Sequence, residues 1–443
     1  MLKTFRIGGI HPPENKRSAN QKIKTLALPK QAVIPLSQHI GAPAEPIVQK
    51  GDMVKVGTLI AKASGFVSAN IHSSVSGKIN KIGEVIDASG TQRPAIYIDV
   101  DGDEWEEAID RDEALTTTCN LSDKEIINKI AAAGIVGLGG ATFPTQIKLS
   151  PPPGNKAEIL IINAVECEPY LTSDHSVMLE KGEQIIVGTN ILMKALQVNR
   201  AVIGIENNKP DAIKHLTQLA AQNCDITIMP LKVRYPQGGE KQLIDAVIRK
   251  QVKSGALPIS EGAVVQNVGT VLAVYEAVQK NKPLIERVVT VTGKNIANPS
   301  NLLVRIGTPI RELIEAAGGL PENSAKIIGG GPMMGKALVN TDVPVTKGSS
   351  GILILTEDDT KRKPIYDCIR CAKCVNVCPM GLNPTLLMSV TEFEKWDMAE
   401  DNYVVDCIEC GSCSYTCPAN RPLLDYIRLG KGKVLGIIRA RKS

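Results

Sequence analysis

Eight of the 11 cysteines in this chain lie in two short runs that share one spacing. Each run has the form C-x2-C-x2-C-x3-C-P, and the runs start at Cys368 and Cys407. Three thiolates on one tight loop can cover three corners of a [4Fe–4S] cube, and a fourth thiolate must then come from elsewhere. Zinc sites take four ligands, commonly as two separated pairs, so the crowded spacing favours iron–sulfur clusters over zinc. The sequence therefore predicts two [4Fe–4S] clusters and one-electron chemistry.

The two runs resemble those of bacterial two-cluster ferredoxins, in which the fourth cysteine of each run ligates the other cluster. The resemblance implies two sets of ligands that each combine cysteines from both runs. The first set is Cys368, Cys371, Cys374 and Cys417, and the second is Cys378, Cys407, Cys410 and Cys413. The linker from Leu382 to Ala399 has Pro384 near its start and few β-branched residues. We therefore expect an α-helical two-cluster ferredoxin domain rather than the βαββαβ form.

Length and composition limit the classes of protein to consider. A chain of 443 residues is too long for one hydrophobic core, so we expect several domains. The net charge of +5 falls to about +1 with clusters bound, because eight thiolates are partly offset by two cores of about +2 each. Aromatic residues make up 3% of the chain, so stacking on bases is a poor explanation and we expect no nucleic-acid partner.

The cellular setting follows from the thiols and from the lack of long apolar runs. Thiolate ligands imply a reducing compartment. The segment from Met1 to Lys16 lacks the apolar run of a signal peptide. No segment approaches the roughly 18 consecutive apolar residues of a membrane span. We expect a soluble chain that can still dock on a membrane partner.

The first predicted domain, residues 1–111, has short apolar segments separated by Gly and Pro. Pro43 to Ile60 alternates in strand fashion around Gly-Asp turns, and Ile71 to Ile79 continues the pattern. The region resembles the flattened barrel sandwich of biotinyl and lipoyl carrier domains. The hairpin from Gly65 to Asn70 has no lysine that could carry such a cofactor. We therefore expect an unmodified structural or docking module.

The second predicted domain, residues 112–281, alternates between helix and strand patterns. Ser122 and Glu125 have the spacing of a capping box, which predicts a helix to about Ala133. Apolar runs of buried-strand length alternate with helical stretches, which favours a Rossmann-like, doubly wound parallel sheet. The expected strands cover 158–163, 201–206 and 225–230, and the expected helices cover about 174–196, 210–221 and 240–248.

Two smaller regions complete the predicted multidomain α/β fold. Residues 282–347 combine β-branched runs such as Arg287 to Gly293 with a short helix from Pro309 to Ala317, which suits a small β-grasp domain of the SLBB kind. Residues 348–443 hold the cysteine runs and a basic C-terminal tail. This tail, from Arg428 to Ser443, could lie on an acidic surface or an anionic membrane. A frayed, solvated tail is the alternative.

A glycine-rich segment, Gly134 to Thr145, is the second feature that bears on chemistry. Glycines let a backbone approach phosphates closely and direct its N–H groups at them. The segment follows a predicted helix rather than a strand, so it does not fit the dinucleotide-binding fingerprint. Taken alone, it could equally be a structural connector.

Four motifs in order resemble the flavin- and NADH-binding subunit of respiratory complex I. They are the glycine segment with Lys148, then Asn163-x-x-Glu166-x-Glu168-Pro169, then Gly238-Gly239-Glu240, then Asn267-Val268-x-Thr270. With the start Gly8 to Pro13 and the terminal cysteine runs, the whole chain is similar to the C subunit of Rnf/Rsx complexes. The resemblance implies a membrane assembly that couples electron transfer between NADH and ferredoxin to ion movement.

The resemblance also implies which residues hold the flavin and the nucleotide. Residues expected to bind FMN are Gly137, Gly139, Gly140, Lys148, Asn163, Glu166, Gly238, Gly239, Glu240, Asn267 and Thr270. Phe143 and Glu168 are expected to contact NADH. The chain departs from the complex I pattern at Val165, which replaces Asp, and at Cys167 and Tyr170, which replace Gly. These departures bear more on NADH geometry than on flavin binding.

The expected function is that of a peripheral subunit on the cytoplasmic face of a bacterial inner membrane. NADH would deliver hydride to FMN, without a protein nucleophile, and single electrons would pass through the clusters to membrane subunits that include a ferredoxin-like one. Two alternatives fit the same residues: an iron–sulfur relay or scaffold with an empty flavin site, and a soluble corrinoid reductase of the same architecture. Flavin content would separate the first alternative from the expected function.

Overall fold

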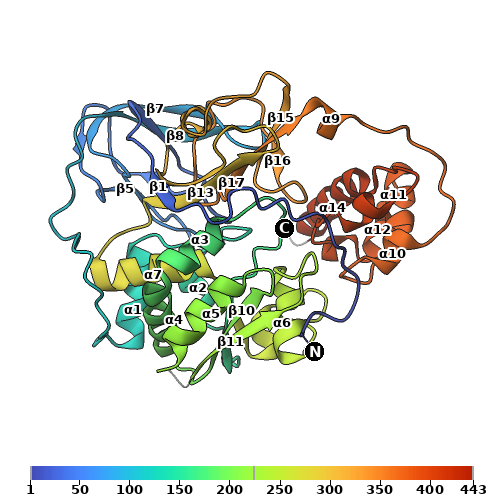
Figure 1. Ribbon diagram of the computed structural model, residues 1–443, viewed down its shortest axis with the longest axis horizontal. Helices are drawn as coiled ribbons and strands as arrows, with labels where there is room; N and C mark the ends of the chain where they lie inside the picture. The colour runs from blue at the N-terminus through green and yellow to red at the C-terminus, as the bar shows by residue number, and fades with distance from the viewer. Residues whose placement is uncertain (1, 223–224, 442–443) are drawn as a thin grey trace.

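A computed structural model describes residues 2–222 and 225–441 of the chain. Two β-rich regions lie beside an α/β region, and a helical region stands at one end (Figure 1). Among the described residues, no helix is both long enough and apolar enough to cross a bilayer.

The first β-rich region has the barrel-sandwich layout that the sequence predicts. Its two sheets have the orders β2-β8-β7-β4 and β3-β5-β6. Ile60, Ile71, Ile79 and Ile96 are buried between them, because alternate residues of a strand point to opposite faces. The strands are β2 (Gln31–Pro35), β3 (Glu45–Pro46), β4 (Met53–Val54), β5 (Leu59–Lys62), β6 (Ile71–His72), β7 (Gly77–Ile86) and β8 (Gln92–Val100).

The α/β region, residues 123–280, is the parallel-sheet domain. All strand pairs in its sheet are parallel, and the order is β11-β10-β9-β12. The doubly wound architecture is therefore confirmed. The elements are α1 (Asp123–Ala132), α2 (Thr145–Lys148), β9 (Ile159–Asn163), α3 (Ser173–Glu180), α4 (Gly182–Leu196), β10 (Ala201–Glu206), α5 (Pro210–Ala220), β11 (Ile226–Leu231), α6 (Glu240–Ile248), a 3-10 helix (Pro258–Glu261), β12 (Ala263–Asn267) and α7 (Val268–Lys280).

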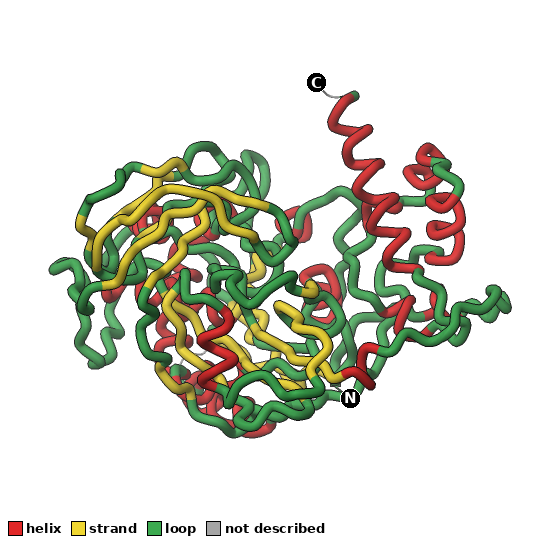
Figure 2. Tube along the Cα trace, turned by 90° about the horizontal axis from the view of Figure 1, so that it is seen from above, coloured by secondary structure: helices red, strands yellow, loops and turns green. Residues whose placement is uncertain are grey.

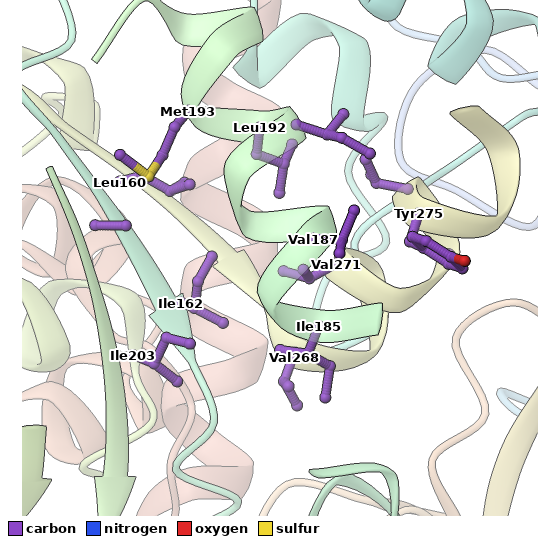
Figure 3. Close-up of a cluster of buried hydrophobic side chains, with 14 of the residues drawn as sticks. Leu160, Ile162, Ile185, Val187, Leu192, Met193, Ile203, Val268, Val271 and Tyr275 are labelled. Carbon is purple, nitrogen blue, oxygen red and sulfur yellow. The ribbon is translucent and has the colours of Figure 1, made fainter. Parts of the chain in front are cut away.

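Figure 3 shows how this domain buries one face of its sheet. Leu160 and Ile162 on β9 and Ile203 on β10 face side chains of helices α4 and α7 (Figure 3). Strands that are covered on both faces need continuous apolar runs, and β10 is buried along its whole length. This packing holds the carboxyl ends of the strands in fixed positions.

One predicted helix of the parallel-sheet domain is wrong in detail. The sequence predicts a single helix over about 174–196, but the structure has two, α3 and α4, which meet at Lys181. At Gly182, an added Cβ atom would lie 2.6 Å from the Nε2 atom of His215 on helix α5. The close approach of α5 therefore coincides with the break, and Gly182 accommodates it.

The second β-rich region is a six-stranded mixed sheet of order β1-β14-β13-β17-β15-β16. Strand β17 lies beyond the predicted domain end at residue 347, yet it pairs with both β13 and β15. The domain boundaries at 111, 281 and 347 stay predictions. The elements are β1 (Ile23–Thr25), β13 (Glu286–Gly293), β14 (Ser300–Arg305), α8 (Ile310–Ala316), β15 (Ser324–Gly329), β16 (Lys336–Ala337), β17 (Gly351–Thr356) and α9 (Glu357–Thr360).

The helical region, residues 361–441, is the cysteine domain. The predicted helical linker is confirmed, because two helices occupy it. The basic C-terminal stretch is helical to residue 440 rather than frayed. This last helix projects from the domain (Figure 2). The elements are α10 (Lys373–Asn376), α11 (Pro384–Glu392), α12 (Trp396–Asp401), a 3-10 helix (Val404–Asp406), α13 (Ser412–Thr416) and α14 (Leu423–Ala440).

Candidate functional site

The topology of the parallel sheet places two predicted site residues side by side. The chain runs from β9 to β10 to β11 on one side, and then adds β12 on the other side of β9. Ligands of such sheets bind outside the carboxyl ends of the strands where the order reverses. Asn163 ends β9, Asn267 ends β12, and the two residues are register partners. The reversal point therefore lies between these two asparagines.

The glycine loop lies over this point and is held there by hydrogen bonds. The N–H group of Leu138 donates to Oγ1 of Thr270 at 2.9 Å, and the N–H group of Gly137 donates to the carbonyl of Phe143 at 2.9 Å. A Cβ atom added at Gly139 would lie 2.9 Å from the Nδ2 atom of Asn267. Gly140 has φ +109°, a conformation that favours glycine. At Gly139 and Gly140 the loop therefore presents backbone without side chains, as the close approach of a phosphate or ring requires.

A partly buried acidic residue, Asp174, joins two more of the predicted residues. Oδ1 of Asn267 accepts hydrogen bonds from the first turn of α7, and its Nδ2 donates to Asp174 at 2.8 Å. The carboxylate of Glu166 accepts N–H groups of Asp174 and His175 at the start of α3. Burial, together with the negative charge of Glu166, raises the pKa of Asp174. The asparagine amide is therefore fixed in orientation by a helix cap on one side and an acid on the other.

The start of helix α6 supplies an anion-binding element. Gly239 is its N-cap residue, so the first N–H groups of the helix lack helical partners, as in known phosphate sites. Nζ of Lys148 lies 2.6 Å from Oε1 of Glu240 in this first turn. Nδ2 of Asn163 donates to the carbonyl of Gly238 at 2.8 Å. The structure thus gathers these predicted residues at one edge of the sheet, with a donor set that fits the phosphate of FMN.

The two residues predicted to contact NADH are placed differently. The carboxylate of Glu168 accepts N–H groups of Met333 and Met334, at 3.2 and 2.9 Å, from the loop after β15. Burial raises the pKa of this carboxyl to about 7. Phe143 is half-buried beside the glycine loop. The hydrogen bonds of Glu168 therefore turn it toward the mixed sheet rather than toward the asparagine pair.

Two cationic residues outside the parallel-sheet domain, Lys16 and Arg287, hold its loops in place, and no sequence motif predicts them. Nζ of Lys16 donates to the carbonyls of Glu166, Glu168 and Leu171 at 2.9, 2.9 and 2.7 Å. Burial lowers the pKa of Lys16. The guanidinium of Arg287, on β13, donates to the carbonyl of Leu138 in the glycine loop. Neither residue has a local motif, because both reach the site through tertiary contacts.

The two predicted cysteine sets each line a separate cavity in the cysteine domain. Each cavity takes a fourth cysteine from the other run, as the resemblance to two-cluster ferredoxins implies. The cluster 1 site is lined by Cys368, Cys371, Cys374 and Cys417. The cluster 2 site is lined by Cys378, Cys407, Cys410 and Cys413. Every cysteine among the described residues is a free thiol.

The environment of the cluster 2 site suits thiolates held by iron. Burial raises the pKa of Cys407 to about 11 and that of Cys413 to about 12, so these thiols stay protonated without a cation. Backbone N–H groups of Leu382 and Glu409 point at the sulfurs of Cys378 and Cys407, each at 3.4 Å. Bound iron would offset the cost of the charged sulfurs, and the N–H groups would stabilise them.

The cluster 2 site faces the parallel-sheet domain. Oη of Tyr235 donates to the carbonyl of Cys410 at 2.9 Å. Nε2 of Gln242, on helix α6, donates to the carbonyl of Pro379 at 3.2 Å. The helix whose first turn forms the anion site thus also contacts the loop of cluster 2 ligands. The expected flavin-binding residues and the cluster 2 cavity therefore both contact helix α6.

Together these features define an electron-transfer protein that combines a flavin domain with a two-cluster iron–sulfur domain. Comparison with known families agrees region by region. An RnfC barrel sandwich hybrid domain matches residues 3–103, and a Nuo51 FMN-binding domain matches residues 130–276. An SLBB domain matches residues 288–337, and a 4Fe–4S dicluster domain matches residues 361–420.

Relatives match along nearly the whole chain. The C subunit of the proton-translocating ferredoxin:NAD(+) oxidoreductase complex of Clostridium ljungdahlii is 48% identical, over 98% of this chain and 94% of that protein. Its counterpart in the Na(+)-translocating complex of Acetobacterium woodii is 44% identical, over 98% and 97%. The chain belongs to the family of C subunits of ion-translocating (Rnf-type) oxidoreductase complexes. Its cofactors are FMN and two [4Fe–4S] clusters.

Two further comparisons extend this result. The C subunit of the ion-translocating oxidoreductase complex of Rhodobacter capsulatus is 44% identical, over 98% of this chain and 84% of that protein. A crystal structure of an NAD+-reducing [NiFe]-hydrogenase matches with a TM-score of 0.50 at 17% identity, over 71% of this chain and 63% of that one. This second likeness concerns the fold alone.

Proposed function

We propose that this chain exchanges electrons between NADH and the other subunits of an Rnf-type complex. In this role it is a peripheral subunit on the cytoplasmic face of the membrane, and the complex as a whole belongs to the translocase class. The names of the relatives support this assignment, since they are C subunits of complexes that join ferredoxin, NAD+ and ion translocation.

The proposed FMN site combines the glycine loop, the asparagine pair and the first turn of α6. The backbone at Gly137, Gly139 and Gly140 would admit the flavin, while Thr270 holds the loop in place. Lys148 and the free N–H groups in the first turn of α6, which begins at Glu240, would bind the phosphate.

Three further positions would orient the ring and the chain that carries the phosphate. They are Asn163, Glu166 and Asn267, with Gly238 and Gly239 lining the pocket near them. Bound FMN supplies hydride acceptance from NADH and one-electron release, which no amino-acid side chain provides. The residues of the chain orient, screen and hold charge around it.

The proposed nucleotide site lies beside the glycine loop, where Phe143 would stack on a ring of NADH. Glu168 would hold NADH only after it leaves the N–H groups of Met333 and Met334. Because its pKa is raised to about 7, the Glu168 carboxyl can be protonated near neutral pH while it contacts Met333 and Met334. NADH binding and this contact between domains would therefore compete.

One observation carries the proposal: helix α6 joins the proposed phosphate site to the cluster 2 site. Its first turn holds Glu240, which pairs with Lys148, and two residues later Gln242 contacts the loop of cluster 2 ligands. A relay subunit with no flavin would not need this arrangement. The rigid helix keeps the two electron carriers at a fixed separation.

Cofactor analysis of the anaerobically purified chain tests the proposal. Acid release should give about one FMN and about eight iron ions per chain. Addition of NADH should bleach the flavin absorbance. About eight iron ions with no flavin, even after FMN is added, would leave the iron–sulfur relay as the function and overturn the flavin site.

A further inference from the structure

The two cluster sites differ in how far they are open to solvent. Cys410 and Cys413 of the cluster 2 site are buried, at 7% and 8% exposure, and this site contacts the parallel-sheet domain. Cys368 and Cys371 of the cluster 1 site are exposed. Cluster 1 is therefore the carrier that a second protein can approach.

The exposed cysteines belong to a continuous surface strip, residues 361–373, which we call the outer segment. Every residue of the outer segment is exposed. In Figure 1 the orange chain between α9 and α10 arcs around the outer edge of the cysteine domain, away from the parallel-sheet domain. Two hydrogen bonds hold it in place. The N–H group of Tyr366 donates to the carbonyl of Ala419 at 3.0 Å, and the side-chain Nδ2 of Asn420 donates to the carbonyl of Pro364 at 2.9 Å.

The outer segment is strongly basic. It has one acidic residue, Asp367, against five basic residues, so its side chains carry a formal charge of +4. A bound cluster with its four thiolates adds about −2 beside it, which leaves the surface basic. Of the basic residues, Lys361 forms an ion pair with Asp358 at 2.7 Å. The full set of basic residues is Lys361, Arg362, Lys363, Arg370 and Lys373. Such a patch attracts a negatively charged partner from solution.

Three large apolar side chains stand among these charges. Ile365 and Tyr366 are each 59% exposed, and Ile369, between the two exposed ligands, is 70% exposed. Exposed apolar side chains within a charged rim are typical of a protein–protein contact. A lipid headgroup surface would use the charges but could not exchange electrons with the cluster beneath them.

We propose that the outer segment is the docking surface for an acidic iron–sulfur protein that exchanges single electrons with cluster 1. This inference rests on the proposed function, because it names the partner surface of the same electron path. One electron crosses the contact in each encounter, so one side is oxidised by one electron as the other is reduced. No bond forms or breaks at this contact. NADH supplies the electrons, or NAD+ receives them, through the proposed flavin site.

A binding experiment with charge-reversed variants tests the surface. The probe is a small acidic two-cluster ferredoxin, presented to the anaerobic, cluster-loaded full chain on an interferometry sensor. In the Arg362→Glu/Lys363→Glu variant the association rate in about 20 mM salt should fall by at least about 10-fold, because two attractive charges become repulsive. Raising the salt to about 500 mM should remove most of this difference, because the Debye length falls from roughly 20 Å to roughly 4 Å.

A matched control separates a local effect from net charge. Lys50 and Lys78 are exposed on the barrel-sandwich region, and Lys50→Glu/Lys78→Glu changes the net charge by the same amount. This control should bind the ferredoxin as the unmodified chain does. An equal loss of binding in both variants would overturn the proposal, since it would reflect total charge alone.

An apolar variant tests the same surface without electrostatics. Ile369→Gln should weaken binding by about 5-fold or more at high and low salt alike, because it removes buried apolar area from the contact. The Ile369→Gln and Arg362→Glu/Lys363→Glu variants should each keep about eight iron ions per chain, which excludes loss of the cluster as the cause of weaker binding. Unchanged ferredoxin binding in both variants would overturn the proposal.

Two further readouts keep this test separate from the proposed function. NADH-dependent reduction of ferricyanide by the unmodified chain reports on the flavin site alone. If that activity is present and the ferredoxin does not bind, the docking surface is wrong and the proposed function stands. Binding of anionic lipid vesicles that is lost in Arg362→Glu/Lys363→Glu, with ferredoxin binding kept, would assign the surface to lipid and also overturn the proposal.

Discussion

Asn267 offers the sharpest test of the proposed flavin site, because its two amide atoms have separate tasks. Oδ1 caps helix α7 by accepting the N–H groups of Gly269 and Thr270 at 2.8 and 3.4 Å. Nδ2 donates to the partly buried carboxyl of Asp174 at 2.8 Å. Asn267→Ala removes both tasks, whereas Asn267→Asp keeps the cap and replaces the donor with a second carboxylate.

The expected costs follow from these contacts. Loss of an N-cap costs about 1 kcal/mol, and a partly buried carboxyl without its donor costs about 1–3 kcal/mol more. Asn267→Ala should therefore destabilise the parallel-sheet domain by about 2–4 kcal/mol. In Asn267→Asp the two acids must share a proton, which raises a pKa of the pair above that of an unfolded Asp. Stability is lost as the pH rises from the unfolded pKa to the raised folded pKa, and in the wild type the pKa of Asp174 is already raised to about 7. The deficit of Asn267→Asp relative to the wild type should therefore grow above about pH 7.

Local readouts suit a chain of several domains, whose unfolding is not a single two-state step. Hydrogen exchange at Gly269 and Thr270 reports on the cap of α7. FMN release, followed by its fluorescence, reports on the proposed pocket and should increase in both Asn267 variants. Ser122→Ala removes the cap of α1 at its end remote from the glycine loop, and should leave FMN release unchanged. Wild-type stability and FMN affinity of Asn267→Asp at about pH 8.5 would refute the reasoning.

Three further sets of variants test other parts of the molecule. Cys368→Ser and Cys413→Ser should each halve the iron content and leave the other cluster in place, because they remove ligands from different sites. Iron analysis and EPR measure this, and loss of both clusters in either variant would contradict the assignment. In the wild type, burial raises the folded pKa of Glu168 from 4.5 to about 7, so the native carboxyl retains a proton that the unfolded chain releases. The stability of the wild type should therefore fall between about pH 5 and pH 7, and Glu168→Gln should abolish this fall. Lys347→Met should abolish the opposite slope, a rise in wild-type stability above about pH 7, because burial lowers that pKa from 10.5 to about 7. Melting curves across these pH ranges check both, and variants whose pH slopes equal the wild-type slope would contradict them.

The features that the sequence predicts well are those whose signals are local. Cysteine spacing identifies the cluster runs, and Ser122 with Glu125 forms the capping box that the sequence predicts at the start of α1. Helix α6 begins at Glu240 as expected, because the glycines before it favour non-helical backbone. Family membership confirms FMN and two clusters as the cofactors. Periodicity and spacing therefore sufficed for the class of protein and for most of its elements.

Tertiary contacts account for what the sequence could not predict. Asp174 and Arg287 contact residues of the proposed flavin site, but each lies far along the chain from the residues it supports. Glu168 lies in a motif from which we predict nucleotide binding. Its hydrogen bonds go instead to the loop after β15, which no local sequence pattern links to it. Strand β17 joins the mixed sheet from beyond the predicted boundary. These contacts depend on how whole domains pack against one another.

The N-terminal segment shows how that packing positions the electron carriers. At Gly8, with φ +71°, an added Cβ atom would lie 2.4 Å from the carbonyl carbon of Cys378, so only glycine allows the chain to pass this close to a cluster 2 ligand. Ile10 then exchanges backbone hydrogen bonds with Tyr235, whose hydroxyl contacts the same group of ligands. Farther along, Lys16 binds three carbonyls of the loop that follows β9. One short strip of chain thus touches the cluster 2 ligands and the flavin-site loop in turn. The separation between the proposed flavin site and the cluster 2 cavity is therefore set by contacts of this strip as well as by helix α6.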